Sequence, residues 1–284
     1  MYSTLLTEID EAIGLITLNR PERQNALDAT LVAELIDALL EFQARPAVRV
    51  VVLSASGLAF CAGIDPAWLR HSEAQGEAAG MRDERLLAQL LTTLNELPKP
   101  TLARVQGPAY GAGIGLIAAC DLAVASEEAN FLFNDIRQGR IAASSAPFFL
   151  AAVGARQGRR YLLGGERFSA IEAYRIGLLH EVVPGADELD AALGALIEPL
   201  LRGAPQAQAE VNEVSRADIL DHGERLRRAG EEHAETGRRE RRDAEDAGCQ
   251  PQNAPQRVAQ AEAHGVGERH DHARPGRGDG DRGH

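Results

Sequence analysis

The chain has 284 residues, of which 44% are apolar and 25% charged, and its formal net charge is −12. This length and composition are typical of a globular protein with one main domain. The negative charge argues against a nucleic-acid partner, because proteins that bind phosphate backbones usually present a basic surface. Three scattered cysteines are too few for a disulfide framework or a zinc cluster, which favours a reducing compartment and no metal site. Since no apolar run approaches the roughly 20 residues of a transmembrane helix, we expect a cytoplasmic protein with no membrane contact.

The first hundred residues alternate between strand and helix patterns. Residues 2–7 and 12–18 have the two-residue alternation of a β-hairpin. Apolar residues then recur at helical spacing from Leu31 to Phe42, and Asp28 is a candidate N-cap for that helix. The aliphatic run at 48–53 predicts a buried strand, and residues 80–96 predict a second helix, which ends before Pro98.

The next hundred residues continue this alternation. A strand is predicted at 101–105, a helix of small residues ends near Cys120, and another strand follows at 122–125. Such strand–helix–strand repeats predict parallel βαβ units and an α/β fold. Ser169 and Glu172 have the spacing of a capping box, Gly177 is expected at a helix C-terminus, and residues 187–201 predict an amphipathic helix.

The composition changes abruptly at residue 227. From there to residue 284 the only branched aliphatic residues are Val258 and Val266, so the segment cannot bury enough apolar surface to offset its ordering entropy. We therefore predict a disordered tail at 227–284. Its bias toward Arg, Gly, Ala, Asp and His resembles out-of-frame translation of GC-rich DNA, and a metal-binding histidine tail is the alternative.

Two turns rich in glycine and alanine, at 61–65 and 107–115, each follow a predicted buried strand and each open a helix. Ligands of α/β proteins bind at this carboxyl edge of the sheet. The unpaired N–H groups of both turns could donate to one oxygen that gains charge during a reaction. Close packing alone also explains such glycines. A dinucleotide fingerprint at 111–115 is disfavoured, because its third glycine would fall on Leu116.

Four motifs, at residues 18–27, 59–65, 99–113 and 119–121, resemble the crotonase (enoyl-CoA hydratase/isomerase) superfamily in order and spacing. The resemblance covers residues 1–205. It implies a ββα spiral core at 1–200 and a helical C-terminal trimerisation region, which would start at 201–226. It also implies assembly as a homotrimer or hexamer.

The resemblance further implies the site residues. The N–H groups of Ile64 and Ala112 would form the oxyanion hole for an acyl-CoA thioester. The CoA portion is part of the substrate, so no separate cofactor is expected. It would lie across Arg23, Gln24, Ala26, Ala62 and Asp65.

Two positions depart from the pattern of enoyl-CoA hydratases, which usually carry two glutamates. The first position is Gly115, which has no side chain to bind water, and the second is Asp135. A carboxylate whose pKa is tuned by its site can act as general acid or base, so we predict Asp135 as the catalytic group. A helix N-cap or a surface charge is the alternative for Asp135. Dienoyl-CoA isomerases and aryl-CoA dehalogenases carry a further aspartate where this chain has Ala143, which disfavours those chemistries.

The run at 110–121, which has glycine at position 115, and the run at 136–141 resemble bacterial methylglutaconyl-CoA and isohexenylglutaconyl-CoA hydratases. These enzymes act in the degradation of branched chains and acyclic terpenes. On this resemblance Gly115 would leave volume for a branched acyl chain, and Tyr110 would lie in the same pocket. Arg137 or Arg140 would pair with a distal carboxylate, since the arginine fork matches a carboxylate.

We therefore predict an enoyl-CoA hydratase-type lyase that hydrates a 2-enoyl-CoA with a branched or carboxylated chain, or catalyses the reverse reaction. An isomerase or decarboxylase on the same scaffold is one alternative. A catalytically silent acyl-CoA-binding homologue is the other.

Overall fold

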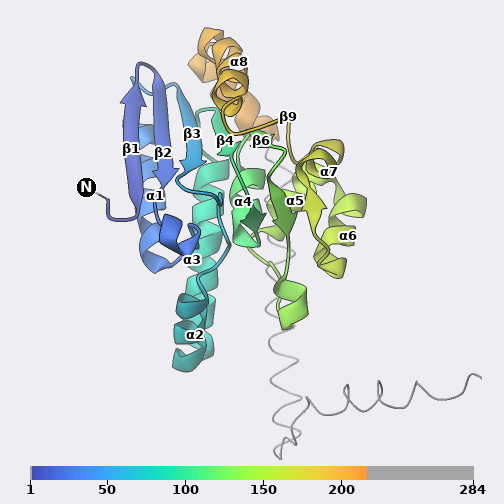
Figure 1. Ribbon diagram of the computed structural model, residues 1–284. Coiled ribbons are helices and arrows are strands. Elements are labelled where there is room, and N and C mark those ends of the chain that lie inside the picture. The colour runs from blue at the N-terminus through green and yellow to red at the C-terminus, as the bar shows by residue number, and fades with distance from the viewer. Residues whose placement is uncertain (1, 216–284) are drawn as a thin grey trace, which may run out of the picture. The chain divides into compact units, whose positions relative to one another are not determined.

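The computed structural model describes residues 2–215, so the predicted tail at 227–284 and residues 216–226 of the region at 201–226 lie outside the described residues. Within this range a six-stranded sheet has the strand order β1-β2-β3-β4-β6-β9 (Figure 1). The predicted hairpin forms from β1, Leu5–Asp10, and β2, Ile13–Leu18, which pair antiparallel. Every later neighbour is parallel: β3, Val50–Ala55, β4, Thr101–Val105, β6, Leu122–Ser126, and β9, Glu181–Val183. The α/β prediction is confirmed.

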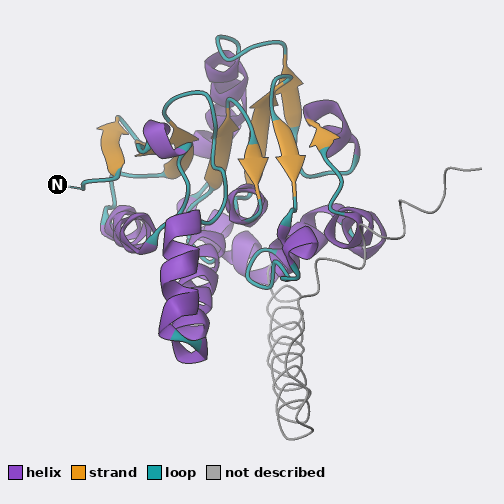
Figure 2. Cartoon of the chain, turned by 60° about the horizontal axis from the view of Figure 1, so that its bottom comes forward, coloured by secondary structure: helices purple, strands orange, loops and turns teal. Residues whose placement is uncertain are grey.

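Helices cover both faces of this sheet (Figure 2). Three helices share the main core with one face: α1, Ala29–Ala44, α3, Glu77–Asn95, and α4, Ala112–Ala119. On the other face α8, Leu189–Arg202, packs Leu193 and Ile197 against Val50 and Val52 of β3. All six residues of β3 are buried. Successive side chains of the strand point to opposite faces of the sheet, and helices cover both faces.

A smaller sheet carries the segment that leads to Asp135. Its strands are β5, Ala109–Tyr110, β7, Asn130–Leu132, and β8, Phe168–Ser169. Around it lie α5, Ala146–Val153, α6, Ala155–Gly164, and α7, Ala170–Arg175. Ring centroids lie 4.9 Å apart for Phe133 and Phe149, and 4.2 Å apart for Tyr161 and Phe168. This aromatic cluster fixes Phe133, two residues before Asp135.

Local signals predicted the helix ends well. The Asp28 carboxylate accepts the Leu31 N–H at 2.9 Å, so the N-cap of α1 is confirmed, and Gly177 has φ +91° after the end of α7. The capping box is only half formed. The Ser169 hydroxyl accepts the Glu172 N–H at 3.2 Å, but the Glu172 carboxylate accepts bonds from Tyr161 and Arg175 instead of returning to the Ser169 N–H.

Helix α2, Pro66–Gln75, was not predicted, and it reaches away from the sheet with the start of α3 (Figure 1). Ser72 is its one buried residue, so it has no apolar stripe to reveal it in the sequence. Two 3₁₀ turns, η1 at Pro21–Arg23 and η2 at Asp135–Gln138, complete the elements that surround the site.

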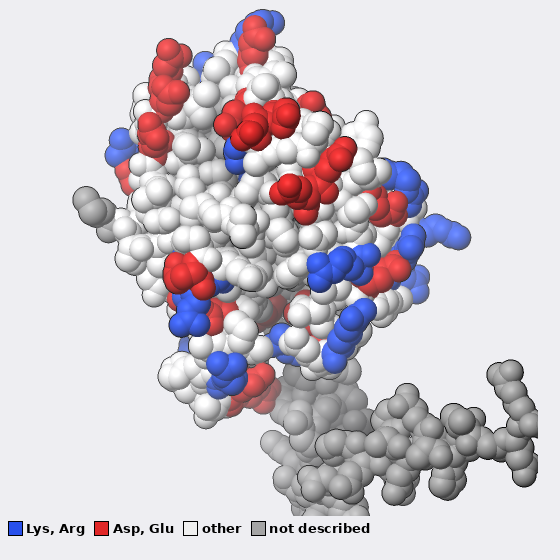
Figure 3. All heavy atoms as spheres, in the orientation of Figure 1, with Lys and Arg blue, Asp and Glu red and all other residues white. Residues whose placement is uncertain are grey.

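Acidic and basic side chains are mixed on the face shown in Figure 3, with most of the arginines of its lower part near acids. Arg160 pairs with Glu166, and Arg175 with Glu172 at 2.6 Å. No helix among residues 2–215 is long and apolar enough to cross a membrane. In the same range no three His, Cys, Asp or Glu side chains gather as a metal ion would require.

Candidate active site

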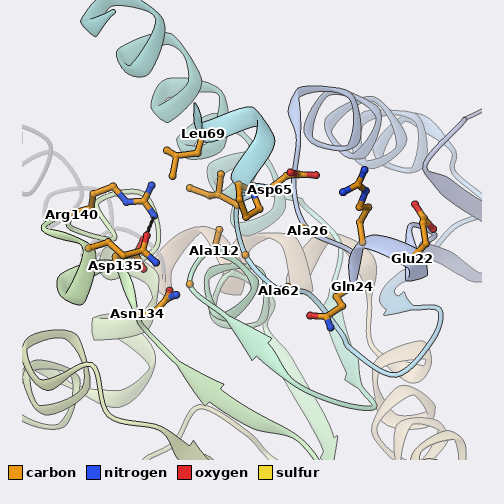
Figure 4. Close-up of a pocket in the computed structure, with 16 residues that line it drawn as sticks. Glu22, Gln24, Ala26, Ala62, Asp65, Leu69, Ala112, Asn134, Asp135 and Arg140 are labelled. Carbon is orange, nitrogen blue, oxygen red and sulfur yellow. Dashed lines mark hydrogen bonds and ion pairs between the residues drawn. The ribbon is translucent and has the colours of Figure 1, made fainter. Parts of the chain in front are cut away.

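A pocket of about 430 Å³ opens at the carboxyl edge of the large sheet. Its lining comes from η1, the turn at 62–66, the start of α4 and η2 (Figure 4). Asp135, Arg140 and Asn134 lie at one end of it, and Gln24, Ala26 and Glu22 at the other, with Ala62 and Ala112 between them. Segments far apart in the sequence therefore meet at the place where α/β proteins bind ligands.

The two glycine-rich turns pack directly on each other. The Tyr110 N–H donates to the Cys61 carbonyl at 2.9 Å, within a parallel bridge between Cys61 and Ala109. Gly63 has φ +88°, and a Cβ built on it would lie 2.8 Å from the Tyr110 carbonyl oxygen and 3.7 Å from the Ala112 nitrogen. Only glycine combines this backbone conformation with such a close approach. The predicted convergence of the two turns is therefore present.

The N–H of Ile64 in the first turn and the N–H of Ala112 in the second have no hydrogen-bond acceptor among residues 2–215. Leu27 bridges the first turn, because its N–H donates to the Gly63 carbonyl at 2.7 Å and its carbonyl accepts the Asp65 N–H at 2.8 Å. In such a parallel bridge the N–H of the intervening residue, Ile64, points the other way. Ala112 is the first residue of α4, where an N–H has no partner inside the helix. Within residues 2–215 neither N–H has a hydrogen-bond acceptor, and both residues line the pocket.

The wall of the pocket opposite Asp135 is stabilised by the buried side chain of Asn25, and its backbone includes two residues in the left-handed conformation. Gln24 and Asn25 have φ of 52° and 54°. The Asn25 amide accepts the Arg20 N–H at 2.8 Å and donates to the carbonyls of Ser56 and Ala59 at 2.8 and 2.9 Å. All five residues expected along the CoA portion line the pocket: Arg23, Gln24, Ala26, Ala62 and Asp65.

Asp65 has structural partners as well. Its carboxylate accepts the Ala67 N–H at 2.8 Å, which caps α2, and it lies 3.2 Å from the Arg20 guanidinium. Arg20 also pairs with Asp28 at 3.0 Å and donates to the Ala26 carbonyl at 2.6 Å. Arg20 thus ties η1, α1 and α2 together behind the pocket.

Asp135 presents an unpaired oxygen at the other end. Its Oδ2 is buried without a hydrogen-bond partner among the described residues, and it lies 3.4 Å from a Cβ built on Gly111, next to Ala112. Its Oδ1 lies 3.9 Å from a guanidinium nitrogen of Arg140 (Figure 4). Asn134, not Asp135, holds the N-cap position of η2, so Asp135 is not a helix N-cap. Only 14% of its side chain is exposed, so Asp135 is not a surface charge either.

Comparison with known proteins agrees with this geometry. The family model described as "Enoyl-CoA hydratase/isomerase" matches residues 8–244. The chain belongs to this family. It is 37% identical over 193 residues to a Thermus thermophilus protein assigned as an enoyl-CoA hydratase, which covers 68% of this chain and 76% of that protein. It is also 35% identical over 186 residues to the hydroxycinnamoyl-CoA hydratase-lyase of Pseudomonas fluorescens, over 64% of this chain and 67% of that enzyme.

Solved structures of the family share the fold. The crystal structure of an enoyl-CoA hydratase from Shewanella pealeana superposes with a TM-score of 0.72 at 33% identity, over 80% of this chain and 88% of that one. The crotonase-like α/β fold is thereby confirmed, and the chain is an enzyme of the enoyl-CoA hydratase type.

Three residues expected in the substrate pocket lie outside its lining: Gly115, Tyr110 and Arg137. The prediction that Gly115 leaves free volume is wrong, because a Cβ there would lie 2.5 Å from Ser145 Oγ and 3.0 Å from Leu91. Tyr110 instead donates to Asn130 at 3.0 Å and accepts a bond from Arg167 at 2.8 Å. Arg137 packs beside Gly165, 3.3 Å from a Cβ built there. Arg140 alone of the two arginines lines the pocket.

The sequence reasoning missed Glu84 of α3. Its carboxylate accepts the Ser144 N–H at 2.9 Å, and Ser144 belongs to the same loop as Arg140. A signal was present, because Glu84 occurs in the helical stripe that continues with the buried Leu87, Leu91 and Leu94. A carboxylate on a core-facing stripe is unusual unless it has partners.

Proposed function

We propose that this enzyme adds water across the C2–C3 double bond of a 2-enoyl-CoA thioester, or removes it in the reverse direction. The observation that carries the proposal is that two unpaired N–H groups, on Ile64 and Ala112, share one pocket with the unpaired Oδ2 of Asp135. Hydration of an enoyl thioester needs these two parts, a site for negative charge on the carbonyl oxygen and a group that moves a proton.

In the proposed reaction the thioester carbonyl accepts hydrogen bonds from both N–H groups. The water oxygen bonds to C3 while Asp135 takes a proton from that water, and the electron pair of the double bond moves onto the thioester as an enolate. Asp135 then returns the proton to C2 on the same face, so the atoms of one water molecule are accounted for. Enzymes lose about 10²–10³ in rate when one oxyanion donor is removed, and general acid–base groups contribute about 10²–10⁴.

For the acyl chain we propose a distal carboxylate. Arg140 supports the carboxylate, because it lines the acyl end of the pocket and 29% of its side chain is exposed. The planar guanidinium of an arginine can donate two parallel hydrogen bonds to a carboxylate, whereas the ammonium group of a lysine acts as a point charge. A branched chain is not proposed, because Ser145 fills the space at Gly115 on which that prediction rested. If Arg140→Ala lowers turnover of a glutaconyl-type thioester no more than turnover of crotonyl-CoA, the carboxylate proposal fails.

Isomerisation of a 3-enoyl to a 2-enoyl thioester is a second candidate. Moving one proton between C4 and C2 needs a single base, and position 115 here carries no second carboxylate. Product analysis with both substrates separates the two reactions, since isomerisation conserves mass whereas hydration adds 18 mass units.

The decisive experiment is a screen of 2-enoyl- and 3-enoyl-CoA esters on the wild type and on Asp135→Asn. We expect Asp135→Asn to lower kcat by about 10²–10⁴ while acyl-CoA affinity is kept. Asp187→Asn is the matched control, because Asp187 is an exposed carboxylate in the loop before α8. Equal kcat for wild type and Asp135→Asn would remove Asp135 from the mechanism. Binding without turnover of any thioester would favour a silent acyl-CoA-binding protein.

We further propose that the reaction needs no metal or cofactor, and that the protein assembles as a homotrimer or hexamer in the cytoplasm. The reaction as written uses only backbone N–H groups and one carboxylate. Activity that survives dialysis against EDTA is the expected result for the first point. Light scattering during size-exclusion chromatography tests the second, and a monomer would contradict it.

A further inference from the structure

The turn that carries the Ile64 N–H is bonded to residues 24–27, the segment between η1 and α1. Leu27 forms the parallel bridge with Ile64, and the Ala62 N–H donates to the Gln24 carbonyl at 3.0 Å. Residues 24–27 belong to neither of the two sheets in the part of the chain that the structure describes. The direction of the Ile64 N–H therefore depends on how firmly this segment is held.

The backbone of this segment needs support from its surroundings. Gln24 and Asn25 are in the left-handed region, which residues with a side chain avoid unless their contacts enforce it. The Arg20 backbone makes two of these contacts. Its N–H donates to the Asn25 side-chain oxygen at 2.8 Å, and its carbonyl accepts the Asn25 N–H at 2.9 Å. Arg20 is thus bonded to the segment that is bonded to the oxyanion turn.

The Arg20 guanidinium joins the same two segments through its side chain. Its Nη1 donates to the Ala26 carbonyl at 2.6 Å, and its Nη2 donates to the Asp65 carboxylate at 3.2 Å. Ala26 and Asp65 are chain neighbours of the bridged pair, so the guanidinium has one contact on each side of the bridge. Both contacted residues line the pocket (Figure 4), whereas Arg20 does not.

This guanidinium is largely buried and paired with two carboxylates. Its Nη2 also lies 3.0 Å from the Asp28 carboxylate, and the exposed fractions of the side chains are 14% for Arg20, 26% for Asp28 and 8% for Asp65. Removing a partner would leave a buried charge without compensation, so the contacts hold one another in place. The planar fork of arginine makes this arrangement with two nitrogens, whereas lysine has a single ammonium nitrogen.

We propose that Arg20 is a positioning residue for the proposed hydration, and that its guanidinium holds the Leu27–Ile64 bridge so that the Ile64 N–H points at the thioester carbonyl. Arg20 acts through Ile64, because it does not line the pocket itself. A donor stabilises the developing negative charge only when its direction is fixed before the reaction. The inference rests on the proposed function, which supplies the thioester carbonyl as the acceptor.

The test compares Arg20→Lys with Arg104→Lys. Arg104 is the matched control, because its guanidinium also joins a carboxylate and a carbonyl, those of Asp190 at 2.6 Å and Ala186 at 3.2 Å, and 20% of its side chain is exposed. With crotonyl-CoA we expect Arg20→Lys to lower kcat by about tenfold with little change in KM, since the donor acts mainly in the transition state. Both variants should melt at a lower temperature than the wild type, but Arg104→Lys should keep the wild-type kcat.

A second measurement does not depend on turnover. Butyryl-CoA has the same thioester but no double bond to hydrate, and its carbonyl carbon can be isotopically labelled for infrared difference spectroscopy. Hydrogen bonds to a carbonyl oxygen weaken the C=O bond and lower its stretching frequency. We expect the wild type and Arg104→Lys to lower this frequency equally, and Arg20→Lys to leave it closer to that of the unbound thioester.

Asp65→Asn replaces Arg20→Lys in this test if the latter does not fold. Its amide oxygen can still accept the Ala67 N–H that caps α2, whereas its amide nitrogen takes the place of the oxygen that accepts from Arg20. The carbonyl frequency should change in the same direction as in Arg20→Lys.

The inference and the proposed function fail differently. A wild-type carbonyl frequency in Arg20→Lys, or in Asp65→Asn where the first variant does not fold, overturns the inference and leaves Arg20 a structural ion pair. If the wild type lowers the frequency of bound butyryl-CoA but turns over no enoyl thioester, the proposed function fails, while the frequencies still decide the role of Arg20. A wild type that binds butyryl-CoA without lowering the frequency would overturn both.

Discussion

Replacing Gly113 by alanine should damage the oxyanion hole while improving the helix that carries it. Gly113 is the second residue of α4, where alanine is favoured over glycine by up to about 1 kcal/mol. A Cβ at this position would, however, lie 2.5 Å from the Cys61 carbonyl oxygen and 2.9 Å from the Cys61 Cβ. These atoms belong to the first turn, so the backbone that carries Ile64 must retreat by about half an ångström to remove the clash.

This displacement sets the expected size of the effect. A misplacement of about 1 Å in an active site can cost about 100-fold in rate, so half of that should cost about tenfold in kcat/KM. The assay follows loss of the enoyl-thioester absorbance with crotonyl-CoA, together with thermal unfolding. We expect Gly113→Ala to melt at a lower temperature, because overpacking costs about 1–3 kcal/mol and exceeds the gain in helix propensity.

Gly194→Ala is the matched control for Gly113→Ala. Gly194 is an exposed helical glycine of α8 with no atom within 4 Å of a built Cβ. It should raise stability by about 0.5–1 kcal/mol and leave kcat/KM unchanged. Full activity in Gly113→Ala would refute the argument that contact between the two turns positions the donors.

Three further results are expected. Asp28→Ala removes the N-cap of α1 and should lower the free energy of unfolding by about 1–2 kcal/mol in urea titrations. Burial lowers the pKa of His180, whose neutral ring accepts a backbone N–H at 3.2 Å. The unfolded chain therefore binds the proton first, so the free energy of unfolding should fall as the pH drops below about 6.5, and urea titrations of His180→Asn should show a weaker fall. Tyr161→Phe removes the hydroxyl that donates to Glu172 and should lower the melting temperature by the equivalent of about 1 kcal/mol, with kcat unchanged.

The sequence allowed five strands of the large sheet, β1, β2, β3, β4 and β6, to be predicted together with helices α1, α3, α4 and α8, because their signals are local. Strand β9 has three residues and was missed. The continuous aliphatic run at 48–53 and the cap at Asp28 each involve neighbours within a few residues. The small sheet was not predicted as a sheet, since β5 and β8 have two residues each and too little pattern to be recognised. Helix α2 was missed because its residues face solvent.

In the candidate site, too, some features could be predicted from the sequence and others could not. The convergence of the two turns followed from their position after parallel strands, which topology alone dictates. The errors at Gly115 and Tyr110 came from partners that are distant in sequence, Ser145 in one case and Arg167 in the other. Which side chain fills a given volume depends on packing between segments, and no pattern within one segment records it.

The packing of Ser145 against Gly115 also dictates the order in which this active site can be altered. A glutamate introduced at 115 would place its first side-chain carbon 2.5 Å from Ser145 Oγ and 3.0 Å from Leu91, before its carboxylate is considered. An engineer who wants a two-glutamate site must therefore shorten residue 145 first, because the reverse order passes through an intermediate whose core is overfilled. The two substitutions are coupled, and their separate effects on stability will not add.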